Sequence, residues 1–361
     1  MIQEAGRHAV YTTRFAGHLA NLFDPYSKRL KRELRLILLD APETTKNIRR
    51  INQIIKEFKG ISLTIYGEYN AEKLLAELEE FSGLEGNFAV KSLTSAINTQ
   101  VTVTAPASVQ VWAAVTSTPL VVPGQGGVNM LGKYIEDMEA IQIRKVSDLI
   151  KTGFMTGRTN NQIASDIAGK GGFLDKQNRR QIKGAVRTAT NHVSNIARQK
   201  TYRDNDDIVR GYEIVATLDG VTSDTCRGYD GTIVLNNASF KPMPPFHQGG
   251  CRTTTAPVLD KRFAIDDGQG TRASKGIEGG QQVPEGQSYY DWLRGQGAQG
   301  PKGRAFVEDV LGNERGKLFL DGGLSVSKFK QLTMDELFRP IPLSELKGKS
   351  SLQIAFDAID G

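Results

Sequence analysis

Long stretches of this chain place apolar residues at three- and four-residue steps, a spacing that puts them on one face of a helix. The first stretch runs from Phe15 to Leu38, where Pro25 could kink or restart the helix. Two further long helices are predicted at residues 131–152 and 176–203. Shorter helices are predicted at residues 47–58, 71–81 and 160–168, the last with a cap at Thr159 or Asn160.

Strand signals are fewer and lie mostly in the C-terminal half. The alternation of Tyr212, Ile214 and Ala216 with their neighbours predicts a half-buried strand, and residues 232–235 could pair with it after the turn at Tyr229–Gly231. The predicted fold class is therefore α+β, mostly helical with a small antiparallel β-sheet in the C-terminal half. Further predictions are a short strand at Ile61–Ile65, an extended Pro-punctuated linker at 101–127, a mobile loop at 266–300, and tail helices at 289–293, 305–311 and 334–338.

The 361 residues are enough for two or three domains of ~150 residues each. We divide them into a basic N-terminal helical region with an extended linker (1–125), a region of helices and a small sheet (126–260), and a loop-rich tail with short helices (261–361). No run of about 18 apolar residues occurs, so no membrane span is expected. Residues 1–20 lack the apolar core of a secretory signal, and 2 cysteines are too few for a disulfide scaffold. We therefore expect assembly in a reducing cytoplasm.

The positive charge is concentrated near the N-terminus. The formal net charge is +6, and residues 1–59 hold twelve Lys and Arg against six acids, so the remainder is neutral overall. The 176–203 helix also has a predicted basic outer face, which includes Arg198. Such faces are either solvated or in contact with DNA or an acidic partner. The candidates for contact with DNA or a portal are Lys28, Arg29, Lys31, Arg32, Arg35, Arg179, Arg180, Lys183 and Arg187.

The densest group of unusual residues lies between Thr217 and Val258. Three of them, Cys226, His247 and Cys251, are suitable zinc ligands, although no fourth ligand is evident. The alternatives are a Cys–His nucleophile, a Cys226–Cys251 disulfide formed only outside the cell, and a structural polar knot in which these side chains bond to turns. The candidate structural motif comprises Asp219, Asp224, Cys226, Gly231, Pro245, His247, Cys251 and Arg252.

Common catalytic motifs are missing from the sequence. It has no GxxxxGK[ST] phosphate loop, no HExxH and no GxSxG, which disfavours an ATPase, a zinc protease and a serine hydrolase. We therefore predict that the chain is not an enzyme and has no catalytic residues. The one cofactor considered is a structural zinc ion.

A string of short segments resembles a known family. The helix that contains Arg187–Ala189 leads into five short segments, which begin with Ala216–Asp219. Further matches lie at 290–293, 311–315 and 332–337. In this order they resemble the phage Mu protein F-like minor head (head morphogenesis) proteins, over about residues 130–340. The two glycines at 249–250 lengthen the step from His247 to Cys251 beyond the family's usual spacing. The segments that follow Ala216–Asp219 are Thr222–Cys226, Tyr229–Gly231, Pro244–His247 and Cys251–Thr254.

The resemblance implies a few-copy protein of a tailed-phage head, with residues 126–260 as its Mu F-like domain. Such a protein lies near the portal and assists head assembly, DNA packaging or ejection. The implied partners are the portal protein, the major capsid or scaffold protein, and phage DNA. The implied location is the virion, after assembly in the host cytoplasm. Two alternative functions are considered. One is a metal- or thiol-dependent enzyme built on Asp219, Cys226, His247 and Cys251, and the other is a nonspecific DNA-binding protein.

Overall fold

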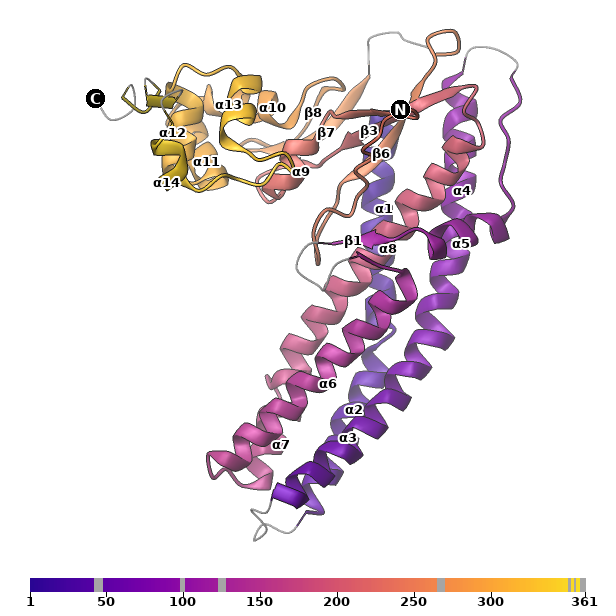
Figure 1. The fold of residues 1–361 in the computed structure, drawn as a ribbon, viewed down its shortest axis with the longest axis vertical. Helices are drawn as coiled ribbons and strands as arrows, with labels where there is room; N and C mark the ends of the chain where they lie inside the picture. Colours follow the sequence, from indigo (N-terminus) through magenta and orange to yellow (C-terminus); the bar gives the residue numbers. More distant parts are fainter. Residues whose placement is uncertain are drawn as a thin grey trace.

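The computed structural model describes residues 1–41, 48–97, 101–122, 128–264, 270–349, 352–353 and 355–357. Its described residues form a long helical bundle, small sheets at one end of the bundle, and a group of short helices that projects sideways beyond the sheets (Figure 1). The N-terminus lies beside the sheets (Figure 1). The predicted fold class, α+β and mostly helical with small sheets in the C-terminal half, is confirmed.

The bundle contains the helices of the first 203 residues. Pro25 restarts the first predicted helix, because α1 ends at Asn21 and α2 carries this proline in its first turn. The Thr159 hydroxyl accepts a hydrogen bond from the Gln162 N–H and caps α7, as predicted. The helices are α1 (Ile2–Asn21), α2 (Asp24–Leu39), α3 (Ile48–Tyr69), α4 (Ala76–Ala96), α5 (Ser108–Ser117), α6 (Leu131–Met155), α7 (Asn160–Ala168) and α8 (Asn178–Arg203), with π-helical turns η1 (Asn70–Leu75) and η2 (Phe173–Gln177).

One apolar core runs through the bundle. The stripe of α2 is fully buried at Leu30, Leu34 and Leu38, and each such side chain stabilises the fold by about 1.5–3 kcal/mol. α8 is the central helix, in contact with α1, α4, α5 and α6. The core extends from Leu19 to Ala197 and so joins helices on both sides of residue 125. Residues 123–127, where we placed a boundary, lie outside the described residues.

Two three-stranded sheets adjoin the upper end of α1 and α8. In the first, β3 (Val209–Val215) pairs antiparallel with β5 (Ile233–Leu235) and β6 (Thr254–Leu259), as the sequence predicted for the β3–β5 pair. In the second, β7 (Thr271–Gly276) pairs parallel with β4 (Leu218–Asp219) and antiparallel with β8 (Gly279–Pro284). Helix α1 contacts both β6 and β7, which ties the sheets to the bundle. A short antiparallel pair, β1 (Leu120–Val121) and β2 (Val128–Asn129), lies beside the bundle.

The projecting group, which we call the C-terminal module, has its own core. The buried aromatic side chains Tyr290, Trp292, Phe319 and Phe329 form its centre. This cluster is distinct from the core of the bundle and includes Leu218 of β4. Its helices are α10 (Tyr289–Gly297), α11 (Gly300–Leu311), α12 (Asn313–Asp321), α13 (Val326–Thr333) and α14 (Leu343–Lys347).

Two predicted extended segments are wrong. Residues Ile61–Ile65 lie inside α3, because Ile54, Phe58 and Ile65 are buried at helical spacing while Leu63 is exposed. Residues 108–117 of the predicted linker form α5, whose Val111 and Val115 lie four residues apart in the core. Residues 101–107 have no regular structure, as expected of a linker.

Two predictions in the tail are also wrong. Residues 271–284 of the predicted loop form the β7–β8 hairpin, although residues 265–269 lie outside the described residues. The tail helices predicted at 289–293 and 305–311 are confirmed by α10 and α11. Residues 334–338 form a turn, because the Asp335 carboxylate accepts hydrogen bonds from the Leu337 and Arg339 N–H groups, 2.9 and 2.8 Å away. Within the described part of the chain, no helix is long and apolar enough to cross a bilayer.

Candidate functional site

Both cysteines and His247 converge between the first sheet and α9 (Asp224–Tyr229). Cys226 lies in α9, and Cys251 lies three residues before β6. Their Sγ atoms are 3.7 Å apart, and one ligand atom from each of Cys226, His247 and Cys251 lies within 4.8 Å of the others. Both thiols are buried and His247 is half-buried. The structure therefore brings together all three predicted zinc ligands.

Neighbouring side chains fix these three residues in place. The Ser223 hydroxyl accepts a hydrogen bond from the Cys226 N–H and caps α9. Pro245, joined to Pro244 by a cis peptide bond, leads directly into Phe246 and His247. The Phe246 ring stacks on Tyr229 at a centroid distance of 4.4 Å, and both rings belong to the same buried cluster as the two cysteines. We call Cys226, His247 and Cys251, with this support, the Cys–His cluster.

Hydrogen bonds within the Cys–His cluster shift the pKa values of its three residues. Burial raises the pKa of Cys251, but hydrogen bonds from Cys226, His247 and the Phe246 N–H outweigh burial and hold that pKa well below the usual value for a thiol. The hydrogen bond to Cys251, followed by burial, raises the pKa of Cys226 well above its usual value. The hydrogen bond to Cys251 also raises the pKa of His247. These contacts therefore favour the thiolate form at Cys251 rather than at Cys226.

Asp219 and Arg252 form a two-pronged ion pair beside the cluster. The Arg252 Nη1 and Nη2 atoms donate to the two carboxylate oxygens of Asp219 at 2.6 and 2.8 Å. The Thr222 hydroxyl donates to the same carboxylate at 2.9 Å. Burial raises the pKa of Asp219, but the hydrogen bonds and charge of Arg252 outweigh it, so the pKa is lowered. These two predicted motif residues are therefore partners, and Arg252 adjoins Cys251 in the chain.

The other predicted motif residues have local roles. Asp224 is in the first turn of α9, nearly half exposed, and accepts a hydrogen bond from Arg227 at 3.0 Å. Gly231 has a φ of 76°, in the left-handed region that favours glycine, and makes the turn into β5. The Asp224 carboxylate is not among the ligand atoms that the Cys–His cluster brings together.

Asp230 and Arg272 form a buried ion pair that was not part of the predicted motif. Asp230 Oδ1 accepts hydrogen bonds from the Ala216 N–H at 2.7 Å and from Arg272 Nη2 at 2.8 Å. Asp230 Oδ2 accepts a hydrogen bond from the Tyr289 N–H at 2.7 Å. The Asp230 side chain is fully buried and that of Arg272 is 5% exposed. Asp230 was visible in Tyr229–Gly231, but Arg272 lies in the segment predicted to be a loop, so no partner could be assigned.

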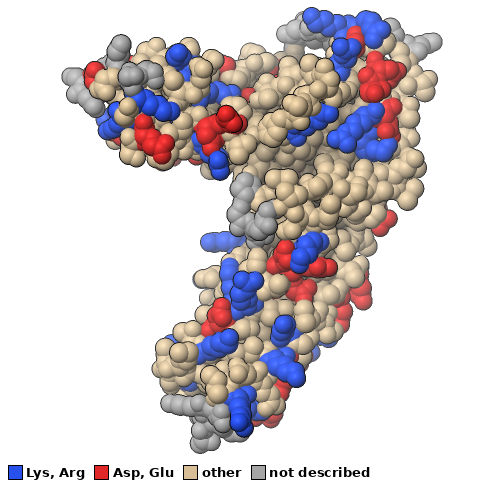
Figure 2. Space-filling view, viewed as in Figure 1, with Lys and Arg blue, Asp and Glu red and all other residues tan. Residues whose placement is uncertain are grey.

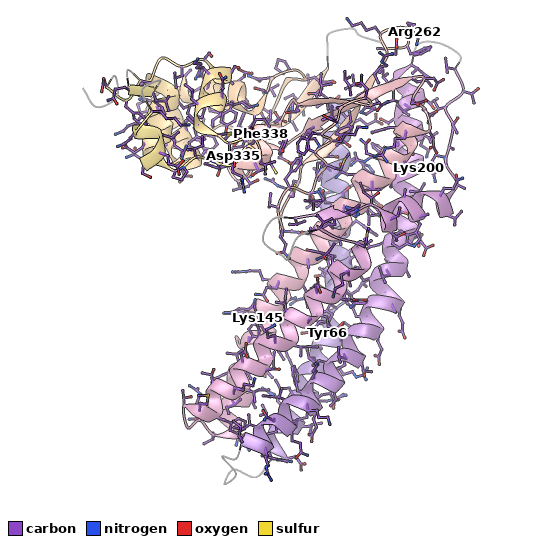
Figure 3. All side chains as sticks on the ribbon, in the orientation of Figure 1. Tyr66, Lys145, Lys200, Arg262, Asp335 and Phe338 are labelled. Carbon is purple, nitrogen blue, oxygen red and sulfur yellow. The ribbon has the colours of Figure 1, made fainter. Side chains whose placement is uncertain are left out.

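Arg227 connects the site to the C-terminal module. Its Nε donates to the Thr222 carbonyl at 2.6 Å and its Nη1 to the Val310 carbonyl of α11 at 2.9 Å. The Tyr289 hydroxyl donates to the Asp219 carbonyl at 2.6 Å. Phe338 packs edge-on against Tyr229 and lies where the module meets the sheets (Figure 3). We call Asp219, Arg227, Asp230, Arg252, Arg272 and Tyr289 the polar knot.

The candidate basic contacts lie on α2 and the first turns of α8 and are partly neutralised. Lys31 pairs with Asp175 and Arg179 with Asp24, which brings α2 beside the start of α8. Arg29 and Arg32 also have acidic partners, Glu68 and Glu33. Figure 2 shows basic and acidic side chains interspersed along the bundle. Among the described residues, no ion pair involves Lys28, Arg35, Arg180, Lys183 or Arg187, and all but the half-buried Arg187 are exposed.

The prediction that Arg198 lies on an exposed basic face is wrong. Its side chain is 1% exposed, and Nε lies 3.3 Å from the fully buried Glu85 carboxylate. Its Nη2 donates to the Thr254 hydroxyl at 2.6 Å, which links α8 to β6. His8 Nε2 contacts the same carboxylate at 2.5 Å. Arg198 therefore joins the bundle to the first sheet, a role that helical spacing alone could not reveal.

The arrangement supports two kinds of chemistry. Thiolates and an imidazole are preferred ligands of zinc, and a low-pKa thiol beside a histidine is also a nucleophile. A cavity of about 10 Å³ is lined by Cys226, His247 and Ser223, enough for one water molecule. A larger cavity of about 180 Å³ lies between α1 and α8, lined by Arg187, Arg252 and neighbours.

No family model matches this chain, and neither does any curated protein or solved structure. The resemblance to the Mu F-like minor head proteins is therefore still a prediction from the motifs.

Proposed function

We propose that this chain is a minor head protein of a tailed phage, located near the portal and active in head assembly, DNA packaging or ejection. The observation that carries the proposal is the convergence of the family-like segments. Tyr229 packs on Phe246 and Phe338, and Arg252 binds Asp219. Segments that are far apart in the sequence are thus in contact with one another. Such contact is expected if the family-like motifs belong to one structural unit.

The later segments join the same assembly. Arg315, in the family-like stretch 311–315, donates hydrogen bonds to the Thr333 and Ile341 carbonyls. Asp230 binds the Tyr289 N–H at the start of α10, and Arg227 binds the last turn of α11. These contacts favour a module whose motif residues hold a shape. The partners proposed for that shape are the portal protein and the major capsid or scaffold protein.

Quantitative mass spectrometry of purified particles tests the proposal. Heads from the phage that encodes this chain should contain a few copies of it per particle. Heads assembled without the portal protein should lose it while their capsid content stays constant. The absence of the chain from portal-containing heads would overturn the proposal.

The hypothesis of a metal- or thiol-dependent enzyme makes a different prediction. Turnover of a substrate should be abolished by His247→Ala while the chain stays folded, and head assembly by that variant should be normal. We propose instead that His247→Ala and variants of the polar knot impair incorporation into heads, because these residues hold the shape that the partners bind. The control is His18→Ala, which changes an exposed histidine of α1.

A second candidate, nonspecific DNA binding, is favoured by basic residues that are exposed and that have no ion pair among the described residues. They are Lys28 and Arg35 of α2 and Arg180 and Lys183 of α8. The association constant for duplex DNA should fall as the salt concentration rises. In a plot of the logarithm of this constant against the logarithm of salt concentration, the slope should be about −0.9 per phosphate contact.

Changing these four residues to Ala should make that slope shallower. Four exposed lysines elsewhere provide the matched control: Lys91, Lys275, Lys302 and Lys328. Equal slopes for the two quadruple variants, or binding independent of salt, would contradict a DNA-binding role for these four residues.

A further inference from the structure

We propose that the Cys–His cluster binds one zinc ion, with Cys226, Cys251 and His247 as protein ligands and a water molecule as the fourth. The three ligand atoms lie within 4.8 Å of one another on three different segments of the chain. The proposal is independent of the phage-head function, since it depends on geometry alone.

The distance between the thiols fits a metal better than a disulfide. In a tetrahedral site with Zn–S bonds of about 2.3 Å, two sulfur ligands are about 3.8 Å apart. The Sγ atoms of Cys226 and Cys251 are 3.7 Å apart. A disulfide would require a separation of about 2.05 Å. The thiols therefore already have the spacing of two zinc ligands.

The surrounding hydrogen bonds match those of zinc sites. His247 Nδ1 lies 3.3 Å from the Gln248 carbonyl oxygen, to which it can donate, and this leaves Nε2 for the metal. A ligating histidine usually donates its other N–H to a carbonyl or carboxylate in this way. The Phe246 N–H donates to Cys251 Sγ at 3.4 Å, as a thiolate ligand accepts.

The fourth position has both space and a polar partner. The cavity of about 10 Å³ beside Cys226 and His247 is lined by Thr253 and Ser223 and would hold one water molecule. The Thr253 Oγ1 atom is buried beside this cavity and has the Cys226 thiol as a polar neighbour. A metal-bound water in this cavity would be within reach of the same hydroxyl.

The proposed ion would join parts of the chain that lack regular structure. Between β5 and β6, no helix or strand occurs in residues 236–253, yet this stretch carries His247 and Cys251. The ion would attach it to α9 through Cys226. A metal that binds only the folded chain stabilises the fold, so its main effect here would be structural.

Elemental analysis of the full-length chain, purified in reducing buffer, tests the proposal. We expect about one zinc per chain, and a tenfold or greater loss in Cys226→Ser, Cys251→Ser and His247→Ala. His18→Ala should keep its zinc, because His18 is exposed on α1. Cobalt should replace the zinc and give thiolate charge-transfer and tetrahedral visible bands.

Two further measurements cover variants that fail to fold. In the wild-type chain, a strong chelator should remove the zinc and lower the melting temperature, and added zinc should restore it. Thiol alkylation after unfolding should detect both cysteines as free. A zinc-free wild-type chain that takes up no cobalt would overturn the proposal. A Cys226–Cys251 disulfide would do so too, as would zinc retained by a variant that carries Cys226→Ser, Cys251→Ser and His247→Ala together.

Discussion

The bundle and the polar knot are stabilised in opposite ways. In the bundle, helical stripes such as Leu30, Leu34 and Leu38 fill one continuous apolar core. In the knot, the groups removed from water are the charges of Asp230 and Arg272. They bind backbone atoms of Ala216, the residue after β3, and of Tyr289 at the start of α10. A buried ion pair adds little net stability, but removing one partner is costly, because the other charge is left buried. The knot should therefore depend on single residues more than the bundle does.

The 2 tryptophans of the chain allow the two regions to be measured separately. Trp112 lies in α5 of the bundle and Trp292 lies in α10 of the C-terminal module. In a Trp112→Phe background, fluorescence reports on the module, and in a Trp292→Phe background it reports on the bundle. Urea unfolding followed in each background tests the comparison.

Asp230→Ala should have the largest effect. It leaves the buried Arg272 guanidinium and the Ala216 and Tyr289 N–H groups without their shared acceptor, so the module should lose about 3–5 kcal/mol of stability. The Trp292 signal measures this loss. The control, Asp224→Ala, removes a carboxylate that is 46% exposed and should cost less than about 1 kcal/mol. Equal losses for the two variants would contradict the role assigned to Asp230.

Leu34→Ala should have the next largest effect, and it should appear in the bundle. Leu34 is fully buried, so the truncation should cost about 3 kcal/mol in the Trp112 transition. Leu36, two residues further along the same helix, is 57% exposed, and its change to Ala should be nearly neutral. A larger shift in the Trp292 transition than in the Trp112 transition would break the distinction between the regions.

Acid should weaken the bundle through His192. Burial lowers the pKa of His192 to about 4, and its Nε2 lies 3.3 Å from the Val115 carbonyl oxygen. The unfolded chain, with a histidine pKa of about 6.5, binds the proton more readily, so this stabilisation is complete above pH 6.5 and is lost as pH falls toward 4. His192 should contribute a loss of about 1.6 kcal/mol between pH 6.5 and 5, measured in the Trp112 transition as the difference between the wild-type chain and His192→Gln. The difference is the quantity to measure, because burial raises the pKa of Glu139 in α6 to about 7 and this residue favours the folded bundle as pH falls. The exposed-site variant His18→Gln should keep the full His192 contribution.

Asp321→Asn should have the smallest effect. Asp321 pairs with Arg304 on the surface of the module, where the two side chains are 39% and 43% exposed. Breaking an exposed pair should cost less than about 1 kcal/mol in the Trp292 transition, and salt should reduce even that. A loss comparable with that of Asp230→Ala would show that charge pairing matters in the module regardless of burial.

The sequence was most informative where a periodic pattern was long. The stripes of α2, α6 and α8 repeat over several turns, so their helices could be predicted from spacing. The alternation at Ile61–Ile65 covers only three apolar residues, and the helical period on either side of it determines the structure. The β7–β8 hairpin could not be predicted, because its glycine, glutamine and serine residues resemble a loop and its stability comes from pairing and from Arg272.

For the site, the sequence predicted which side chains gather but not how they are held. Cys226, His247 and Cys251 meet as predicted, and Asp219 lies beside them through Arg252. The partners of Asp230 and Arg198 are distant in the sequence, at Arg272 and Glu85. Spacing within one segment contains no information about such long-range pairs.

Hydrogen exchange of the wild-type chain and Asp230→Ala tests the central claim most directly, namely that buried polar contacts hold the motif segments together as one unit. We predict that the variant loses amide protection together in β4, β7 and α10, while α3, α6 and α8 keep theirs. Loss of protection only at residues next to 230, or equal loss throughout the bundle, would contradict the account.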